Sequence, residues 1–247
     1  MKKKIIAICI VVCLAVIAAT GATLAYFTAE DSADNVFTMK GIKIEIEETF
    51  EQNSTLIPGL DINKDVFVAN TGSADAYVRV HIAIPAVLDS GASALSDSKG
   101  FLHMAYADGS VASGQWSWIA EYTDGTGIGD ALNRYDAEID GIEYSVYVVT
   151  YRTALGAGEK TATQALDKVF VDSAVDCEWD EEKSCYYYTD ADGNTAHPSN
   201  FADANGNVTI KVFAEAAQTV TFDDAYDALN TAFGTPGATG YVAPWNR

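Results

Sequence analysis

The sequence predicts a mainly β protein, an antiparallel β-sandwich with a long inserted loop region and a short C-terminal helix. Short segments in which apolar and other residues alternate recur along most of the chain, and this two-residue period is typical of strands with one buried face. One stretch near the C-terminus has helical spacing instead. Because each predicted strand has a single apolar face, two sheets must bury those faces against each other.

The expected strands begin after the first 40 residues of the chain. Six of them contain residues 42–46, 66–68, 78–84, 142–148, 169–171 and 210–216. A seventh and an eighth strand are expected on either side of Glu181, where Trp179 would pair with Lys183. We find no internal repeat, and the strands are too short and too few for a propeller.

Residues 86–135 do not follow the alternating pattern. They are rich in Ser, Gly, Ala and Asp, a composition typical of connections between strands. We therefore interpret this range as a long loop insertion, with a short helix near Asp130–Ala137.

The C-terminal stretch 221–234 is the clearest helix. Apolar side chains recur at spacings of four, three and four from Phe222 to Phe233, so they share one face. Thr221 is the expected N-cap, and Gly234 is expected to end the helix. We expect this helix to cover an end or an edge of the sandwich.

The charge balance excludes several classes of partner. The chain has 247 residues, with 15 Lys and Arg against 35 Asp and Glu, and a net charge of −20. Binding to nucleic acid or to an anionic membrane surface needs a cationic face, so neither partner is expected. Hydrophobic residues make up 49% and charged residues 20%, which is typical of a globular protein.

The first 25 residues have the pattern of a signal peptide. Three lysines precede fifteen apolar residues, Ile5–Ala19, whose helix would span about 22 Å, short of a hydrocarbon core of about 30 Å. We predict cleavage between Ala25 and Tyr26, with an uncleaved signal anchor as the alternative. The product would be one sandwich domain, residues 26–247, secreted to the extracellular space or the cell surface. It would contact the membrane only through an uncleaved signal segment.

No arrangement of residues indicates catalysis, and we predict that the protein is not an enzyme. The three histidines, His81, His103 and His197, form no H-E-x-x-H motif, and the chain has no Gly-x-Ser-x-Gly or phosphate-binding glycine loop. His81 lies at a position of its strand that the alternation assigns to solvent, so we interpret it as a surface residue.

The cysteines of the expected mature chain are Cys177 and Cys185. If Asp180–Glu182 form a hairpin turn, the two lie opposite each other, which favours a disulfide in an exported protein. Two free thiols are the alternative. A catalytic thiol is not expected, because the neighbouring acidic residues would raise the thiol pKa.

Two acidic loops contain oxygen donors of the kind that Ca²⁺ prefers. The candidate ligands are Asp190, Asp192, Asn194, Asp203 and Asn205. Neither loop has EF-hand spacing, and the Asp-Gly and Asn-Gly pairs in them are strong hairpin-turn signals. We favour turns, and we expect no other metal site and no cofactor.

Residues 22–28 (ATLAYFT) resemble the T-x-A-Y-F-T/S signature of proteins exported through the SipW-type signal peptidase. Further segments resemble the core of the TasA/camelysin-like family of secreted proteins, namely residues 41–48, 56–59, 64–72, 76–80, 151–159 and 210–218. Ala157 stands where the family often has proline. The 86–135 loop and the 177–207 hairpins do not match clearly.

The resemblance implies a jelly-roll and a role as a structural protein at the cell surface or in the biofilm matrix. It further implies self-association into fibres, in which an N-terminal strand of one subunit is donated to the next, after export by the signal peptidase. In this sequence, Val36, Phe37 and Met39 would supply the apolar anchors. The alternative is that this segment starts the subunit's own first strand. The metallopeptidase label of the camelysin branch has no supporting metal motif here.

A second hypothesis is a monomeric surface adhesin or carbohydrate-binding module. Trp116, Trp118, Trp179 and Tyr186–Tyr188 would then provide aromatic platforms on loops of the sandwich. The same residues are also suited to core packing and cross-strand pairing. A glycan array distinguishes these interpretations, because a structural subunit should show no selective binding.

Overall fold

A computed structural model defines the fold of this protein. It describes residues 41–50, 54–89, 100–105, 115–118, 133–202 and 207–246, which all belong to one compact unit. The predicted signal peptide, the Ala25–Tyr26 junction and the proposed anchors Val36, Phe37 and Met39 lie outside the described residues, as do Asp203 and Asn205.

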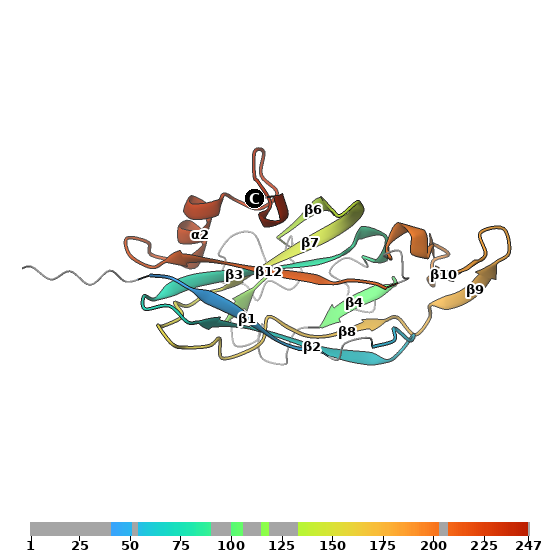
Figure 1. Ribbon diagram of the computed structural model, residues 1–247, viewed down its shortest axis with the longest axis horizontal. Helices are drawn as coiled ribbons and strands as arrows, with labels where there is room; N and C mark the ends of the chain where they lie inside the picture. The colour runs from blue at the N-terminus through green and yellow to red at the C-terminus, as the bar shows by residue number, and fades with distance from the viewer. Residues whose placement is uncertain are drawn as a thin grey trace, which may run out of the picture. The chain divides into compact units, whose positions relative to one another are not determined.

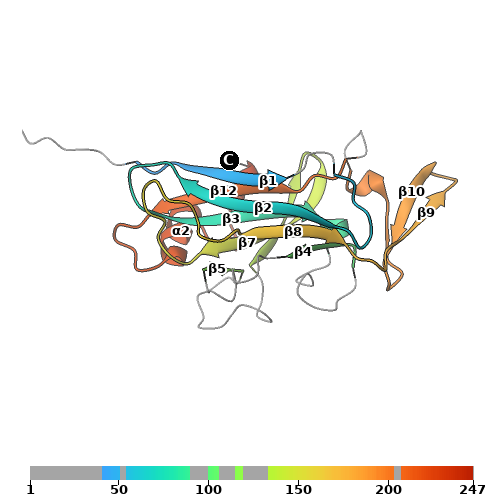
Figure 2. The ribbon, with the colours of Figure 1, turned by 90° about the horizontal axis from the view of Figure 1, so that it is seen from below.

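Two antiparallel sheets face each other, so the predicted β-sandwich is confirmed (Figures 1 and 2). Sheet 1 has the strand order β1 (Ile44–Phe50), β2 (Asp61–Asn70), β8 (Leu166–Val171) and β4 (Leu102–Ala105). Sheet 2 has the order β12 (Lys211–Gln218), β3 (Ala76–Pro85) and β7 (Ile142–Tyr151), with β5 (Trp116–Ser117) and β6 (Arg134–Ile139) paired along the outer edge of β7. The jelly-roll connectivity stays a prediction.

The main core lies between the two sheets. Val66 and Val68 of β2 are fully buried and belong to one apolar cluster with Val80 and Ile82 of β3. The apolar residues of the alternating pattern are therefore those on the face of each sheet that packs against the other sheet. Burying such a valine, leucine or isoleucine contributes about 1.5–3 kcal/mol to the free energy of unfolding.

The outer face of sheet 2 is also covered. Helix α2 (Ala225–Phe233) packs on β12 and β3, and the chain after it lies over β6 and β7 (Figure 1). There Tyr241, Ala243 and the 3-10 helix η4 (Pro244–Asn246) with Trp245 join a second apolar cluster. Sheet 2 is thus the middle layer of this part of the fold.

The range 86–135 contains regular structure that the sequence did not predict. It includes the 3-10 helix η1 (Ala86–Leu88) and strands β4 and β5, so it is not a single loop. The short helix predicted near Asp130–Ala137 is wrong, because residues from Arg134 onward form β6. This strand turns into β7 through Asp140 and Gly141, which both have positive φ, as a two-residue hairpin turn requires.

The C-terminal helix is confirmed, but it begins later than expected. Asp224 is the N-cap, and its carboxylate accepts a hydrogen bond of 2.8 Å from the backbone N–H of Asp227. Thr221, the predicted cap, has a φ of 78° and lies before the helix. Gly234 ends the helix with a φ of 87°, as predicted.

A third, separate sheet continues from the end of β8. It consists of β9 (Asp176–Asp180), β10 (Cys185–Thr189) and β11 (Thr195–Ala196), followed by the 3-10 helix η3 (Pro198–Asn200). Trp179 pairs with Tyr186 and not with Lys183 as predicted, because the hairpin turn has four residues, Glu181–Ser184.

Over the described residues, no helix is both long and apolar enough to span a membrane.

Candidate functional site

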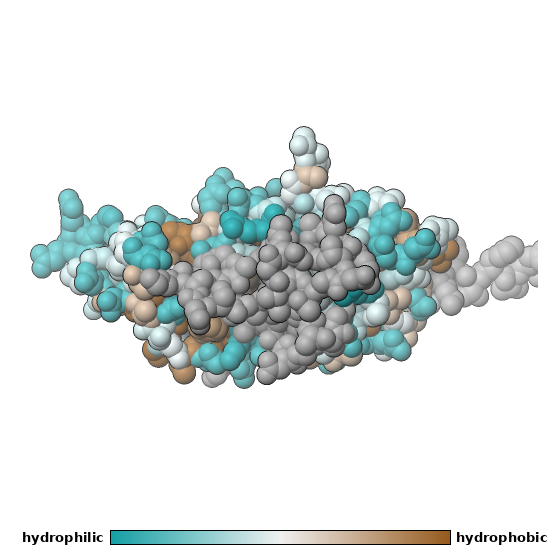
Figure 3. Space-filling view, turned by 180° about the vertical axis from the view of Figure 1, so that it is seen from behind, coloured by the Kyte–Doolittle hydropathy of each residue, from teal (hydrophilic) through white to brown (hydrophobic). Residues whose placement is uncertain are grey.

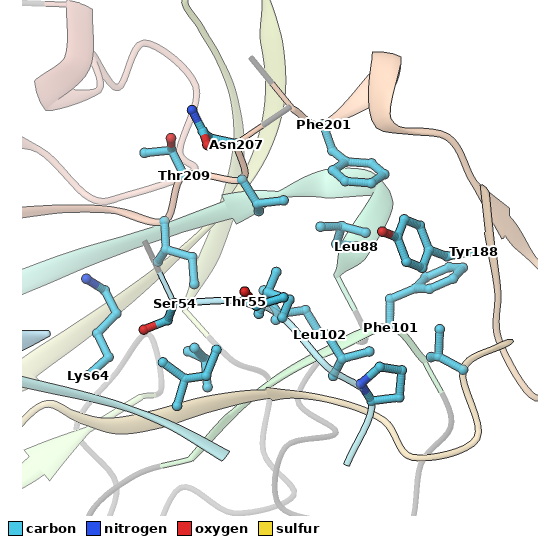
Figure 4. Close-up of a pocket in the computed structure, with 18 of the residues that line it drawn as sticks. Ser54, Thr55, Lys64, Leu88, Phe101, Leu102, Tyr188, Phe201, Asn207 and Thr209 are labelled. Carbon is cyan, nitrogen blue, oxygen red and sulfur yellow. The ribbon is translucent and has the colours of Figure 1, made fainter. Parts of the chain in front are cut away.

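An apolar groove of about 660 Å³ opens between the two sheets, beside the third sheet. Most of its lining is aliphatic or aromatic, and includes Phe50, Leu56, Ile62, Leu88, Phe101, Leu102, Val171, Val175, Tyr188, Phe201, Val208 and Ile210. Figure 4 shows Leu88, Phe101, Tyr188 and Phe201 gathered on one side of the groove, with Lys64 and Ser54 on the other. The groove therefore has an aromatic end and a polar end.

The turn at Pro58–Gly59 holds one wall of the groove in place. Gly59 has a φ of 78° and donates its N–H to the carbonyl of Val171 at 2.9 Å. A side chain at this position would be strained by that φ. The turn fixes the segment before β2 beside β8, so that Leu56 and Pro58 face the cavity rather than closing it.

Lys64 is a buried cation at the polar end of the groove. Only 3% of it is exposed, and its ammonium lies 3.3 Å from the Glu48 carboxylate and 4.8 Å from the centre of the Phe50 ring. Lys64 was not among the site residues predicted from the sequence. Its position in the sequence could have indicated burial, because Lys64 shares the inward face of β2 with Ile62 and Val66. A charge at such a position must be paired, or it must serve a ligand.

The shape and lining of the groove are suited to binding an extended ligand. An extended apolar segment matches its lining, and Lys64 can attract a carboxylate or a carbonyl oxygen at one end. Within the described part of the chain, no group of three or more His, Cys, Asp and Glu side chains could hold a metal ion.

His81 is wholly buried, so its interpretation as a surface residue is wrong. It faces away from the core between the sheets, but α2 and the C-terminal segment cover that side of sheet 2. Its Nε2 lies 3.1 Å from the Glu215 carboxylate, and its Nδ1 lies 3.2 Å from the hydroxyl of Tyr135. Arg79 donates to the same oxygen of Glu215 at 2.6 Å.

This buried polar network ties the covering segments to sheet 2. Arg79 also donates to the side chain of Asn230 at 3.0 Å and to the carbonyl of Gly234 at 3.2 Å, both at the end of α2. At the other end of the network, Trp245 donates to the hydroxyl of Tyr135 at 3.1 Å. The partners are parts of the fold itself, which is the pattern of a structural network.

Burial and charge act against each other on Glu215. Burial works to raise the pKa of its carboxyl, but the hydrogen bond from His81 and the charge of Arg79 together hold that pKa below its ordinary value. For Tyr135, burial dominates and raises the pKa of the phenol, which is therefore neutral. The network thus holds Glu215 as an anion.

The other two histidines lie elsewhere in the fold. His103 of β4 is buried, with its Nε2 3.2 Å from the Asp172 carboxylate and its ring stacked on Phe170 at 4.9 Å. His197 precedes η3 and contacts the ammonium of Lys183 at 3.1 Å. The structure therefore brings each histidine to a different set of neighbours.

The predicted disulfide is wrong, and both cysteines are free. Cys177 pairs with Tyr188, whereas Cys185 pairs with Asp180. The two positions are three residues apart along the ladder, which is about 10 Å, beyond the reach of about 7 Å between the Cα atoms of a disulfide. They also lie on opposite faces of the hairpin, because side chains alternate.

The first acidic loop is a turn, as the sequence analysis favoured. Asp190 is buried, and its carboxylate accepts hydrogen bonds of 2.8–2.9 Å from the backbone N–H groups of Asp192 and Asn194 and from the Asn194 amide. Burial works to raise the pKa of Asp190, and these hydrogen bonds lower it further than burial raises it. The carboxylate thus organises its own loop.

The aromatic residues named for an adhesin divide into two groups. Trp116 and Trp118 are 1% and 4% exposed and belong to the main core, where the indole of Trp116 donates to the carbonyl of Thr163 at 3.0 Å. Trp179 and Tyr186 are 51% and 55% exposed. Tyr187 and Tyr188 are partly buried, and Tyr188 lines the groove.

No protein-family model matches the chain, and no curated protein matches its sequence.

Proposed function

We propose that this protein is a secreted structural protein of the cell surface or biofilm matrix that self-associates by strand donation. In this proposal the segment 26–39 of one copy, freed by cleavage after Ala25, enters the apolar groove of the next copy. The observation that carries the proposal is the groove, which is lined mostly by apolar residues and lies between the edge strand β1 and the segment that leads into β12. The resemblance of the cleavage region to SipW-dependent proteins supports export.

The edges beside the groove can accept a further strand. Among the described strands, β1 pairs only with β2, and β12 pairs only with β3. Each therefore has a second edge whose backbone groups another strand can pair with, as in β-augmentation. Charged side chains protect the edge of β1 from unselective pairing, namely Glu45 and Glu47 in the strand and Lys43 just before it.

The chemistry of the donated segment complements the groove. Val36, Phe37 and Met39 match the apolar lining, and the acidic residues that precede them carry the charge opposite to that of Lys64. The competing interpretation, in which residues 26–40 begin the subunit's own first strand, predicts a monomer in which that segment pairs with its own sheet.

Counterions should control the assembly. Without residues 1–25 the chain has 12 Lys and Arg against 35 Asp and Glu, a charge of −23. Repulsion between such subunits is screened by salt and bridged by divalent cations. Fibres or oligomers should therefore become longer or more numerous as ionic strength rises from about 0.01 M to 0.3 M.

Electron microscopy of protein that begins at Tyr26 tests the proposal. We expect fibres or oligomers that strengthen with NaCl or CaCl₂, and none from a variant that begins at Gly41. Monodisperse monomer of the longer form under every condition would sink the proposal. Equal assembly by both forms would place the contact outside the donated segment.

The adhesin hypothesis remains a second candidate on one observation, the exposed Trp179–Tyr186 pair. The two rings meet at 72°, so they do not form the single flat platform on which a sugar ring stacks. A glycan array tests this candidate, and selective binding that is lost in Trp179→Ala would favour it.

A further inference from the structure

The hairpin β9–β10 has two chemically different faces. On one face Trp179 and Tyr186 lie directly opposite each other, with ring centres 5.0 Å apart in an edge-to-face arrangement. On the other face Tyr187 donates to the Glu178 carboxylate and stacks on His197. The first face is exposed aromatic surface, whereas the second is a hydrogen-bonded cluster.

Both large rings of the aromatic face are more than half exposed. A single exposed apolar side chain needs no explanation, but adjacent ones form a patch suited to a partner. Cross-strand aromatic pairs also stabilise a hairpin. A test of binding must therefore leave the hairpin folded.

The charge around this face selects the kind of partner. Residues 176–189 contain five acidic side chains and one lysine. By alternation, Asp176, Glu178 and Asp180 lie on the opposite face, whereas the exposed Glu181 and Glu182 lie in the turn next to the Trp179–Tyr186 pair. Figure 3 shows mostly hydrophilic surface at this end of the sandwich, at the left of that view. A second copy of the same acidic hairpin would be repelled, and a cationic partner would be attracted.

We propose that the Trp179–Tyr186 face of the hairpin binds a cationic polypeptide segment. Arginine or lysine side chains of the partner would stack on the exposed ring faces, and the carboxylates of Glu181 and Glu182 would supply the opposite charge. Trp179 and Tyr186 are not among the groove residues, although Tyr188 on the same face is, and the proposal does not depend on self-association.

The hairpin contains its own reporter of binding. Cys177 is exposed and shares the aromatic face, one pleat away from Trp179, whereas Cys185 lies on the opposite face. A ligand on the aromatic face should shield the Cys177 thiol and leave Cys185 accessible. Alkylation rates of the two thiols, followed by peptide mass spectrometry, therefore report both binding and the face that is bound.

The probe is the blocked peptide (Gly-Arg)₄, compared with its isosteric (Gly-citrulline)₄ form, which has no charge. We expect the arginine peptide to slow alkylation of Cys177 at least about threefold relative to Cys185 at low salt, and the citrulline peptide to have no effect. The protection should weaken as ionic strength increases.

Two sets of variants separate binding from folding. Trp179→Val with Tyr186→Thr keeps strand-forming residues but removes both rings, and it should abolish protection of Cys177. Neutralising the two turn carboxylates in E181Q/E182Q should weaken protection at least about threefold. The matched control E138Q/E143Q removes two exposed charges elsewhere and should leave protection unchanged. Circular dichroism of each variant confirms that it is folded.

Several results would overturn the proposal. Equal protection by the citrulline peptide would show that the cation is not recognised. Unchanged protection in the double aromatic variant would place the peptide elsewhere. Shielding of Cys177 by chitohexaose, or by raising the protein concentration alone, would assign the face to a glycan or to a second copy.

Discussion

The outer faces of the two sheets use the same residue types for different purposes. On sheet 1, Lys160 and Glu47 form an ion pair of 3.0 Å that is about half exposed. On sheet 2, Arg79 and Glu215 form an ion pair of 2.6 Å that is 2% exposed. The first pair lies on a solvent-exposed surface. The second pair lies beneath α2 and the C-terminal segment and helps to hold both on sheet 2.

The comparison shows that a charged residue at an alternating position does not reveal whether water or protein faces it. Strand β2 alternates between buried and more exposed residues, whereas β3 is buried along nearly its whole length. Exposed pairs contribute little to stability, and a buried pair becomes costly when one partner is removed. The following predictions test this difference, beginning with the largest effect.

Arg79→Met should be the most destabilising of these changes. It leaves the Glu215 anion buried without its cation and removes the bonds to Asn230 and Gly234. We expect the free energy of unfolding to fall by about 3–5 kcal/mol. Urea denaturation measures it, with Lys160→Met on the exposed pair as the control, expected to cost no more than about 1 kcal/mol. Equal losses in the two variants would contradict the comparison.

Tyr135→Phe should loosen the C-terminal cover. It removes the oxygen that accepts from Trp245 and contacts His81, and buried polar groups left without a partner cost about 1–3 kcal/mol. Hydrogen exchange over residues 241–246 should become faster. The control Tyr186→Phe removes a hydroxyl from an exposed ring and should leave exchange there unchanged.

Lowering the pH should reduce the free energy of unfolding, because Glu215 beneath the covering segments becomes protonated. Its pKa in the folded protein is lowered, so its contribution is present above the unfolded pKa of about 4.3 and is lost as pH falls through the folded pKa. Urea denaturation of Glu215→Gln should therefore show a smaller decline in stability than the unsubstituted protein as pH falls from 5 to 3. Parallel pH curves would show that Glu215 is not held as an anion by this network.

Asp224→Ala should have the smallest effect, a loss of about 1 kcal/mol from the N-cap of α2. Thr221→Ala, at the position that the sequence predicted as the cap, should cost less than half as much, because Thr221 caps no helix. The two midpoints of urea denaturation provide the measurement. A larger loss from Thr221→Ala would restore the original assignment.

Local patterns predicted much of the sandwich. Alternation located β2, β3, β7 and β12, and the spacing from Phe222 to Phe233 located α2, because these signals depend on neighbouring residues. Strand β6 was missed because a Ser- and Gly-rich stretch precedes it, although Tyr135 and Ile139 follow the two-residue period. The hairpin register was wrong because the turn begins one residue later and is one residue longer than expected, which moves the partner of Trp179 by three positions. The Asp180 side chain stabilises that turn.

The sites depended on contacts between distant segments and could not be predicted. His81 is buried by α2 and by the chain near Trp245, more than 140 residues later in the sequence. The groove is assembled from the ends of several strands, so no single stretch indicates it. Lys64 is the site residue that was nearest to being predictable, because a lysine on the apolar face of a strand indicates either a buried ion pair or a binding site.

Sedimentation velocity of a matched pair of variants tests the central claim, assembly through the groove. Val208→Arg places a bulky cation in the groove lining, and Val220→Arg places the same charge at a position that is 66% exposed. In protein that begins at Tyr26, at about 0.3 M NaCl, we predict that Val208→Arg sediments as a monomer, whereas Val220→Arg assembles like the unsubstituted protein. Assembly of the Val208→Arg variant to the same extent would contradict the account.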